Sequence, residues 1–312
     1  MNLPVRALIV LNPAAHGGAA APRFDAVRPI LESSFDARTV VGRADGEWRS
    51  EVRTALEDGV RAFVAAGGDG TAHALLNVLI EAPRRPPLET LTLGAVGLGS
   101  SNDLHKPARR RADGVPLLLD VARAAPRDIV RCTYVDAAGR HVVYMLISAS
   151  IGATASANAR FSERTRAARL LRRVSTTAAV VWAAARTVAT WRNIPVLLGI
   201  DEGVPERIAV TNLSVLKTEW LSGRFRFGRP VEPASGDFDV ALAEGLGRLG
   251  LLVDILALLR GRFDGRAGHR RWRARSLDVR ADNEVPLEVD GEIVRAREAR
   301  FDVLPERVRL CA

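Results

Sequence analysis

The segment Gly67-Gly68-Asp69-Gly70-Thr71 constrains the fold of this chain more than any other feature. It follows the apolar run Ala62–Ala66, which is typical of a buried strand, and precedes the stretch Thr71–Ile80, which predicts a helix. Glycines let main-chain N–H groups approach an anion closely, and a helix N-terminus attracts negative charge. The segment therefore predicts a phosphate-binding loop, with a tight turn capped by Asp or Thr as the alternative.

Short apolar runs alternate with helical stretches on both sides of this loop. The expected strands are Val5–Leu11, Ala37–Val41, Ala62–Ala66 and Thr92–Val96, and the expected helices are Pro22–Glu32, Trp48–Glu57 and Thr71–Ile80. Strands that alternate with helices at this spacing indicate a parallel sheet with helices on both faces. The sequence thus predicts an α/β N-terminal domain with glycine-rich nucleotide loops.

Two further polar loops follow the first and the fourth expected strands. They are Asn12–Gly18 and Gly97–Asp103, both rich in Gly, Asn or Ser. The carboxyl ends of parallel strands meet at one edge of a sheet, so three such loops predict one composite nucleotide site there. A carboxylate beside a phosphate is repulsive unless a cation lies between them, so we expect Asp69 to face Mg²⁺ or to accept a proton.

The second part of the chain has a different pattern, which begins near Asp128. Longer β-like runs predict an antiparallel sheet or sandwich, at Ile129–Val135, His141–Ser150, Val196–Ile200, Arg207–Leu216, Phe238–Ala243, Leu277–Arg280 and Pro286–Val289. A helix is expected over Glu163–Trp191. Arginines crowd its first half, at Arg164, Arg166, Arg169, Arg172 and Arg173. This helix is expected to pack on the sheet, with docking at a membrane as the alternative.

Composition limits the classes of protein to consider. With 312 residues, 47% of them hydrophobic, the chain can fill two cores, and Cys132 and Cys311 form no disulfide or zinc pattern. The apolar run Ala7–Leu11 is far shorter than the roughly 20 residues of a membrane span, so we expect a cytoplasmic protein without span or signal peptide. The net charge of +9 indicates either a solvated basic surface or one that binds nucleotide phosphates or an anionic membrane. With 5% aromatic residues, nucleic acid is not expected as a partner.

In order and spacing, these motifs resemble the diacylglycerol-kinase catalytic-domain family, which includes bacterial lipid kinases, sphingosine kinases and ceramide kinase. The resemblance rests on Asn12-Pro13 with Gly17-Gly18, on GGDGT at 67–71, on LGxxND at 98–103 and on Val289-Asp290-Gly291-Glu292. It implies an α/β ATP-binding domain at residues 1–125, to which residues 298–312 return. A β-rich lipid-substrate domain at 126–297 would follow, with the substrate cleft between the two domains.

The resemblance also implies a set of site residues. The ATP-binding positions would be Asn12, Pro13, Ala14, Ala15, His16, Gly67, Gly68, Asp69, Gly70, Thr71, Ala72, His73, Ser100, Asn102 and Asp103. The acidic, metal-facing positions would be Asp69, Asp103, Asp128 and Asp237. The catalytic carboxylates would be Glu292, Asp290 and Asp69. Residues two apart on a strand face one side, so Asp290 and Glu292 are expected to point together into the cleft, unless Asp290-Gly291 is a hairpin turn.

Some positions depart from the family pattern. His73-Ala74 replaces the common Asn-Glu, and the glycine-rich turn is reduced to Ser222-Gly223-Arg224. Ser235-Gly236-Asp237 stands where bacterial members use an Asp-Gly turn to support a structural magnesium. The supporting carboxylate is therefore absent or shifted to Asp237.

The sequence thus predicts an ATP- and Mg²⁺-dependent lipid kinase that acts on diacylglycerol or a similar lipid alcohol, peripherally at an anionic membrane. An NAD kinase is the first alternative because it shares GGDG, but NAD kinases typically carry Asn-Glu where this chain has Asn102-Asp103. A catalytically weak membrane- or nucleotide-binding regulator is the second. The acceptor lipid and the oligomeric state, a homodimer included, stay open.

Overall fold

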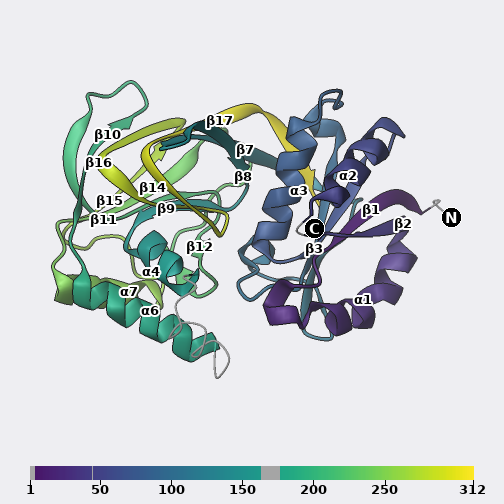
Figure 1. The fold of residues 1–312 in the computed structure, drawn as a ribbon, viewed down its shortest axis with the longest axis horizontal. Coiled ribbons are helices and arrows are strands. Elements are labelled where there is room, and N and C mark those ends of the chain that lie inside the picture. The colour runs from purple at the N-terminus through teal and green to yellow at the C-terminus, as the bar shows by residue number, and fades with distance from the viewer. Residues whose placement is uncertain (1–3, 44, 163–175) are drawn as a thin grey trace.

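Two lobes share one continuous β-sheet in the computed structural model, which describes residues 4–43, 45–162 and 176–312 (Figure 1). In the N-terminal lobe the strand order is β2-β1-β3-β4, with all neighbours parallel. These strands are β1 (Val5–Leu11), β2 (Phe35–Val41), β3 (Ala62–Gly67) and β4 (Thr92–Gly97). The helices are α1 (Ala20–Ser34), α2 (Glu47–Glu57) and α3 (Asp69–Glu81), with short 3₁₀ turns η1 (Ala15–Gly18), η2 (Leu88–Thr90) and η3 (Asp103–His105). The expected α/β lobe is confirmed.

Alternating side chains of β1 show why helices cover both faces of this sheet. Ala7 and Ile9 pack with the buried residues of α1, whereas Leu8 and Val10 pack with those of α2 and α3. A strand with both faces buried is apolar throughout, as the sequence of β1 indicates. The short strands β5 (Arg111–Ala112) and β6 (Val115–Leu118) extend the sheet antiparallel beside β4.

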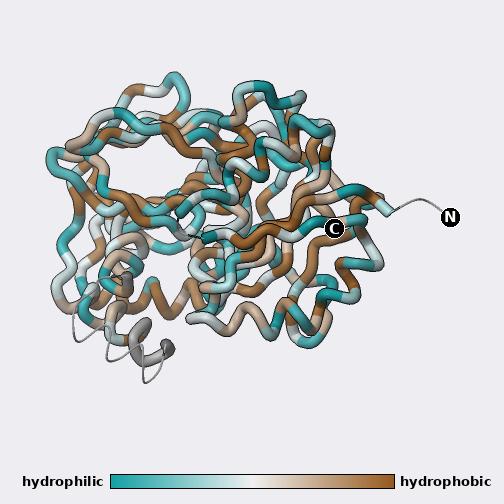
Figure 2. The backbone as a smooth tube through the Cα atoms, turned by 45° about the vertical axis from the view of Figure 1, so that its right-hand side comes forward, coloured by the Kyte–Doolittle hydropathy of each residue, from teal (hydrophilic) through white to brown (hydrophobic). Residues whose placement is uncertain are grey.

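The C-terminal lobe is mainly antiparallel. It contains β7 (Ala125–Asp136), β8 (Gly139–Met145), β9 (Ser148–Gly152), β10 (Ile194–Ile200), β11 (Glu206–Leu216), β14 (Phe238–Glu244), β15 (His269–Ala274) and β16 (Ser276–Val289), plus the pair β12 (Trp220–Leu221) and β13 (Phe225–Arg226). The helices α4 (Ala153–Ser162), α6 (Thr176–Thr190) and α7 (Arg248–Leu258) lie along one side of this lobe (Figure 1). Hydrophobic segments follow the strands of both lobes, and hydrophilic ones the outer loops (Figure 2).

Two expected strand boundaries in this lobe are wrong. The run expected as one strand at His141–Ser150 is two strands, β8 and β9, because the chain breaks at Leu146-Ile147, where apolar residues gave no turn signal. Conversely, the two runs expected at Leu277–Arg280 and Pro286–Val289 are one strand, β16. Its polar middle is accommodated by a register shift between Arg280 and Val285.

One long strand joins the lobes. β17 (Glu292–Leu310) has 19 residues and pairs antiparallel with β16 and β7 before its end pairs in parallel with β4, at Arg309 opposite Thr92 and Leu310 opposite Leu93. Its many arginines hide it from a search for apolar runs. The domain limits at 125/126 and 297/298 stay a prediction.

The arginine-rich half of the expected helix Glu163–Trp191 falls on residues 163–175, which lie outside the described residues. The rest of it is α6, which contacts α4 and α7. Among the described helices, none has the length and apolar character needed to cross a membrane.

Candidate active site

The three polar loops at the carboxyl edge of the parallel sheet contact one another, as expected. Asn12 Nδ2 donates to Thr71 Oγ1 at 3.2 Å, which links the first loop to the second. Leu98 N donates to Gly67 O at 2.8 Å, and a β-carbon on Gly99 would lie 2.5 Å from the Cα of Gly68. Glycine is therefore required where the second and third loops cross. Together the loops form one continuous main-chain surface.

Helix α3 begins at this surface. Gly68 is extended and precedes the helix, and its carbonyl accepts from the N–H groups of Thr71 and Ala72 at 2.9 and 3.3 Å. The N–H groups of Asp69 and Gly70 belong to the first turn, which has no intrahelical acceptors. The positive end of the helix dipole reinforces these donors. This end of α3 is thus suited to phosphate oxygens.

The Asp69 carboxylate ties the third loop to α3. It accepts from Asp103 N at 3.0 Å and from Leu104 N at 3.2 Å. Burial and the nearby charge of Asp103 raise the pKa of Asp69 to about 7, against the lowering effect of the two N–H groups. A cation placed beside this carboxylate would stabilise its charged form, so Asp69 and Asp103 fit a Mg²⁺ ion shared with phosphates.

Asp103 bridges the two lobes. Its carboxylate accepts from Gly223 N at 3.0 Å in the C-terminal lobe and from Lys106 Nζ at 2.5 Å, and Lys106 also donates to Gly223 O. Lys106 belongs to none of the sequence motifs. A signal was available, because only two of the 45 Lys and Arg residues are lysines, Lys106 and Lys217, and both reach across the fold.

Asp290 lies in a hairpin turn, not on a strand face. Val289 pairs with Glu292 across the turn, and Asp290 has a φ of 48°. The expectation that Asp290 and Glu292 point together from one strand is therefore wrong. The buried Asp290 carboxylate accepts from the N–H groups at 146–148, at 2.9, 2.9 and 3.0 Å, and lies 3.4 Å from His73 Nδ1. This carboxylate anchors the break between β8 and β9.

Glu292 has a different environment. Its side chain is exposed, and within the described residues it has no hydrogen-bond or ion-pair partner. A β-carbon on Gly70 would lie 2.7 Å from Glu292 Oε1, so the carboxylate reaches the first turn of α3. Glu292 is thus a free carboxylate placed beside the expected phosphate-binding surface.

Glu288 is a second residue that the sequence analysis missed. It is buried, and it accepts from Ser150 Oγ at 3.0 Å and from Asn158 Nδ2 at 2.9 Å. Burial raises the pKa of Glu288, with smaller contributions from the charges of Asp103 and Asp290. In the sequence, Glu288 could have been noticed as a charged residue between the apolar Leu287 and Val289. We refer to Asp69, Asp103, Glu288, Asp290 and Glu292 as the junction acids.

The remaining ATP-binding candidates surround the same surface. Asn102 folds the third loop, because its amide donates to the carbonyls of Gly97 and Gly99 and accepts from Gly99 N. His16 and Ser100 are exposed. Pro13, Ala14 and Ala15 lie at or before η1, and Thr71, Ala72 and His73 are buried in the first turns of α3.

Asp128 and Asp237 lie elsewhere, and their surroundings do not fit a metal ion. Asp128 accepts from Lys217 Nζ at 2.9 Å and from Arg307 Nε at 2.6 Å. Asp237 pairs with Arg273 at 2.8 Å and accepts from Ser235 Oγ at 2.6 Å. In the part of the chain that the structure describes, no cluster of three or more His, Cys, Asp or Glu side chains is arranged for a metal.

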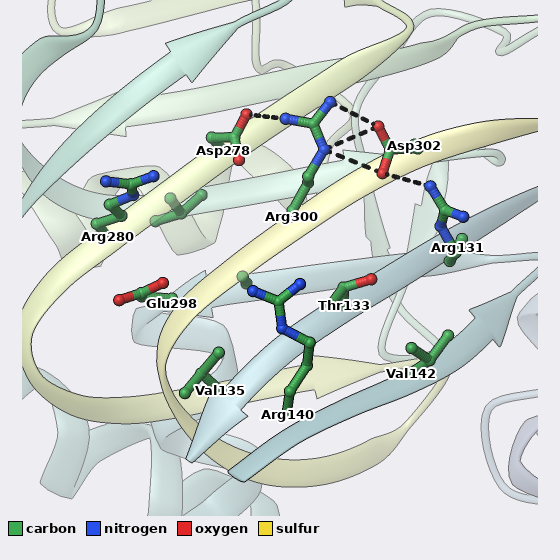
Figure 3. Close-up of a pocket in the computed structure, with 12 residues that line it drawn as sticks. Arg131, Thr133, Val135, Arg140, Val142, Asp278, Arg280, Glu298, Arg300 and Asp302 are labelled. Atoms are coloured by element: carbon green, nitrogen blue, oxygen red, sulfur yellow. Dashed lines mark hydrogen bonds and ion pairs between the residues drawn. The ribbon is translucent and has the colours of Figure 1, made fainter.

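A hollow of about 520 Å³ on the surface of the C-terminal lobe is separate from this site. Figure 3 shows that a chain of ion pairs crosses it, in which Arg300 bonds to Asp278 at 2.5 Å and to Asp302 at 2.9 Å, and Asp302 bonds to Arg131 at 3.2 Å. These charges neutralise one another. Arg140, Arg280 and Glu298 also line the hollow, and its described lining residues belong to neither the three loops nor the hairpin of Asp290.

Comparison with known proteins agrees with this geometry. The model of the diacylglycerol kinase catalytic domain matches residues 6–131, and that of the YegS C-terminal NAD kinase beta sandwich-like domain matches residues 148–312. The chain belongs to the diacylglycerol-kinase catalytic-domain family. The first matched range includes all three polar loops, and the second includes the hairpin of Asp290.

Individual members of the family are distant from this chain. A diacylglycerol kinase of Staphylococcus epidermidis is 31% identical over 109 residues, which is 33% of each chain. The chain thus aligns with about a third of that relative's length. A crystal structure of a diacylglycerol kinase from Bacillus anthracis has a TM-score of 0.68 at 16% identity, covering 99% of this chain and 97% of that one.

Yeast NADH kinase, solved with NADH, shares the fold at a TM-score of 0.51 and 10% identity, over 100% of this chain and 84% of that one. At such identities the two solved structures show a common fold only. The two-lobe architecture is therefore common to lipid kinases and to a dinucleotide kinase.

Proposed function

We propose that this protein transfers the γ-phosphoryl group of ATP to the hydroxyl of diacylglycerol or a similar lipid alcohol. The observation that carries the proposal is the juxtaposition of the α3 N-terminus with the free carboxylate of Glu292. Main-chain donors on one lobe face a proton acceptor from the other, and phosphoryl transfer needs both. The family membership supports the same class of reaction.

On this proposal the N-terminal lobe binds the nucleotide. The N–H groups of the loop Gly67–Thr71 and of the first turn of α3 hold phosphate oxygens, and Asn12 fixes Thr71 from the neighbouring loop. Asp69 and Asp103 would hold Mg²⁺, which when bound spreads the negative charge of the phosphates. Asp69 also keeps the third loop in place through two hydrogen bonds.

We assign proton acceptance to Glu292 and positioning to Asp290. Three N–H groups already occupy the Asp290 carboxylate, whereas the Glu292 carboxylate is exposed and unpaired among the described residues, so it can accept a hydrogen bond from a substrate hydroxyl. His73 and Asn77 on α3 meet Asp290 and Tyr144 of the C-terminal lobe, which fixes the two lobes relative to each other.

Incubation of the pure protein with γ-labelled ATP, Mg²⁺, a panel of lipid alcohols and NAD tests this proposal. Label in a lipid is the expected result. Label in NAD alone would instead identify an NAD kinase, the alternative favoured by the fold of yeast NADH kinase. Nucleotide binding without any labelled product would indicate the regulator.

An anionic membrane surface is the proposed location of the acceptor. Helix α7 carries a stripe of exposed apolar side chains at helical spacing, Leu249, Leu252, Val253 and Leu256, and Leu259 continues the stripe directly after the helix. Arginines flank the stripe at both ends, at Arg248 and at Arg260 and Arg262. An apolar face bounded by cations is suited to lie among anionic lipid headgroups.

Vesicle sedimentation tests this surface. Leu252→Glu combined with Leu256→Glu should weaken binding to anionic vesicles, whereas Val204→Glu, at a still more exposed apolar residue outside α7, should not. Activity on a water-soluble short-chain diacylglycerol should survive the α7 changes, so a failed surface is distinguishable from a failed active site. Unchanged vesicle binding of the double variant would exclude α7.

A further inference from the structure

Lys217 is fully buried at the end of β11, and its ammonium group has three oxygen partners. It donates to Asp128 Oδ2 at 2.9 Å, to Glu232 O at 3.0 Å and to Asp237 O at 2.6 Å. An ammonium has three N–H donors, so this set satisfies all of them. We refer to Asp128, Lys217, Arg307 and the turn Glu232–Asp237 as the Lys217 corner.

The partners of Lys217 differ from those of an ordinary ion pair. Two of the three are main-chain carbonyls at the opposite ends of one six-residue turn, and the third is a carboxylate on β7. Carbonyl and carboxylate oxygens that converge on one point are the ligands that a hard cation takes in proteins. The Lys217 corner thus has the ligand set of a cation site, with a cation from the chain inside it.

The distances belong to an ammonium and not to a metal. Oxygens lie about 2.0–2.1 Å from Mg²⁺ and about 2.3–2.6 Å from Ca²⁺, whereas those around Lys217 Nζ lie 2.6 to 3.0 Å away. The positive charge of Lys217 also repels any second cation. A divalent ion therefore cannot enter while the side chain keeps this position.

The charge of the turn matches a monovalent cation. The family resemblance implies a magnesium-supporting Asp-Gly turn where this chain has Ser235-Gly236, and the Ser235 hydroxyl donates to the Asp237 side chain at 2.6 Å. Gly236 N donates to Asp128 Oδ2 at 2.7 Å, so the same carboxylate also holds the turn directly. Asp128 already faces the Lys217 ammonium and the Arg307 guanidinium, so a divalent ion in place of the ammonium would add further positive charge.

We propose that the Lys217 ammonium replaces a structural divalent cation in this protein, so that the turn Glu232–Asp237 folds without a metal. The choice of residue supports this assignment. The chain has 45 Lys and Arg residues and uses arginine almost everywhere, yet it has lysine here. A planar guanidinium cannot direct three donors at oxygens around one point, whereas a compact ammonium can.

The Lys217 corner adjoins the candidate active site through the main chain. Lys217 N donates to Ile147 O at 2.9 Å, and Arg127 Nη2 donates to the carbonyls of Leu146 and Lys217 at 2.8 Å each. The N–H groups of Leu146 and Ile147, in the same segment, donate to the Asp290 carboxylate. A metal-independent corner therefore keeps the support of Asp290 intact when divalent ions are scarce. The inference stands apart from the proposed function, because its test measures stability.

The first test is the melting temperature without nucleotide, with EDTA or with Mg²⁺ or Ca²⁺. An Asp69→Asn background weakens any binding of these ions at the junction acids, so that a change in Tm reports on the Lys217 corner. The expected Tm is the same in all three conditions. A Tm that falls in EDTA and recovers with Mg²⁺ or Ca²⁺ would overturn the proposal.

The second test removes the ammonium. Lys217→Met keeps the length of the side chain but leaves the buried Asp128 and two carbonyls without their donor, so Tm should fall by about 10 °C. Addition of Mg²⁺ should not restore it, because the methionine still fills the space. A Tm equal to that of the parent would contradict the proposal.

The third test exchanges the two kinds of cation. Lys217→Ala with Ser235→Asp vacates the space and supplies a second carboxylate, so this double variant should gain a Tm that rises with Mg²⁺ or Ca²⁺. If it does not fold in EDTA, recovery of folded protein on refolding with Mg²⁺ supports the proposal equally. No response to either ion, folded or refolding, counts against a cation site at this corner.

Discussion

The junction acids and the Lys217 corner are two buried acidic regions of the same molecule with opposite electrostatics. At the junction, burial and the charge of Asp103 raise the pKa of Asp69 to about 7. At the corner, burial would raise the pKa of Asp128, but hydrogen bonds from Lys217, Arg307 and Gly236 N lower it overall. The corner is internally neutralised, whereas the junction has more negative charge than its neighbours compensate.

This difference in charge compensation supports a ligand-binding site at the junction and not at the corner. Four carboxylates, those of Asp69, Asp103, Glu288 and Asp290, interact electrostatically at the junction. Lys106 pairs with Asp103, and His73 contacts Asp290. Uncompensated buried charge is unfavourable in the free protein and becomes favourable when a cation binds. This excess of negative charge supports the proposed Mg²⁺ and phosphate site at the junction, whereas Lys217 already supplies the positive charge at the corner.

The largest expected effect is that of Asp69→Asn. Removal of this charge should lower phosphoryl transfer about 1,000-fold and change its Mg²⁺ dependence, because metal and third loop both depend on the carboxylate. Steady-state kinetics over a Mg²⁺ titration measure both. The matched variant Asp128→Asn should instead lower the free energy of unfolding by about 3–5 kcal/mol and leave the turnover of folded protein unchanged. Near-normal turnover of Asp69→Asn would refute the comparison.

Glu292→Gln should have the next largest effect. It keeps shape and hydrogen bonding but not basicity, so kcat should fall about 100-fold while the Kd for ATP stays the same. Asp290→Asn is the control. It disturbs three buried hydrogen bonds, so it should reduce Tm as well as kcat. Normal turnover of Glu292→Gln beside an inactive but stable Asp290→Asn would make Asp290 the base.

The sequence predicted the N-terminal lobe more accurately than the C-terminal one, for a physical reason. Parallel strands buried on both faces are uniformly apolar, and glycine loops at their ends have few uses other than turns and phosphate binding. Strand β17 could not be found in this way, because its arginines face solvent and its pairing depends on partners far along the chain.

The same limit explains which site residues were missed. Lys106 and Glu288 belong to no motif, and their importance depends on contacts with Gly223 and Asn158 from the other side of the junction. The motif identified Asp290 as a site residue, but it did not predict that Asp290 lies in a hairpin turn. Whether a carboxylate is free or bound by main-chain N–H groups is decided by tertiary structure, which places the break between β8 and β9 against the hairpin.

The pH dependence of stability gives a smaller effect that separates the two regions. The pKa of Asp69 rises from 3.8 to about 7 on folding, so its stabilising contribution is complete below 3.8 and is lost as pH rises through about 7. The pKa of Asp128 is lowered, so its contribution is present above 3.8 and is lost as pH falls through the lower folded value.

Denaturant unfolding between pH 4 and pH 8 measures this contrast. Asp69→Asn should flatten the loss of stability between about pH 4 and pH 7, and saturating Mg²⁺ should flatten it in the parent protein. Asp128→Asn should leave that slope in place. An identical slope in the parent and in Asp69→Asn would show that Asp69 does not titrate in this range.

Arg307→Met should have the smallest effect. Arg307 and Lys217 both contact Asp128, but the Arg307 side chain is 41% exposed and that of Lys217 is 0% exposed. Water can replace an exposed guanidinium but not a buried ammonium, so Arg307→Met should lower the free energy of unfolding by less than about 1 kcal/mol and leave kcat unchanged. Urea denaturation of Arg307→Met and of Lys217→Met compares the two losses in the free energy of unfolding. Equal losses in the two variants would mean that burial does not distinguish the partners of Asp128, and the corner would then be an ordinary ion-pair network.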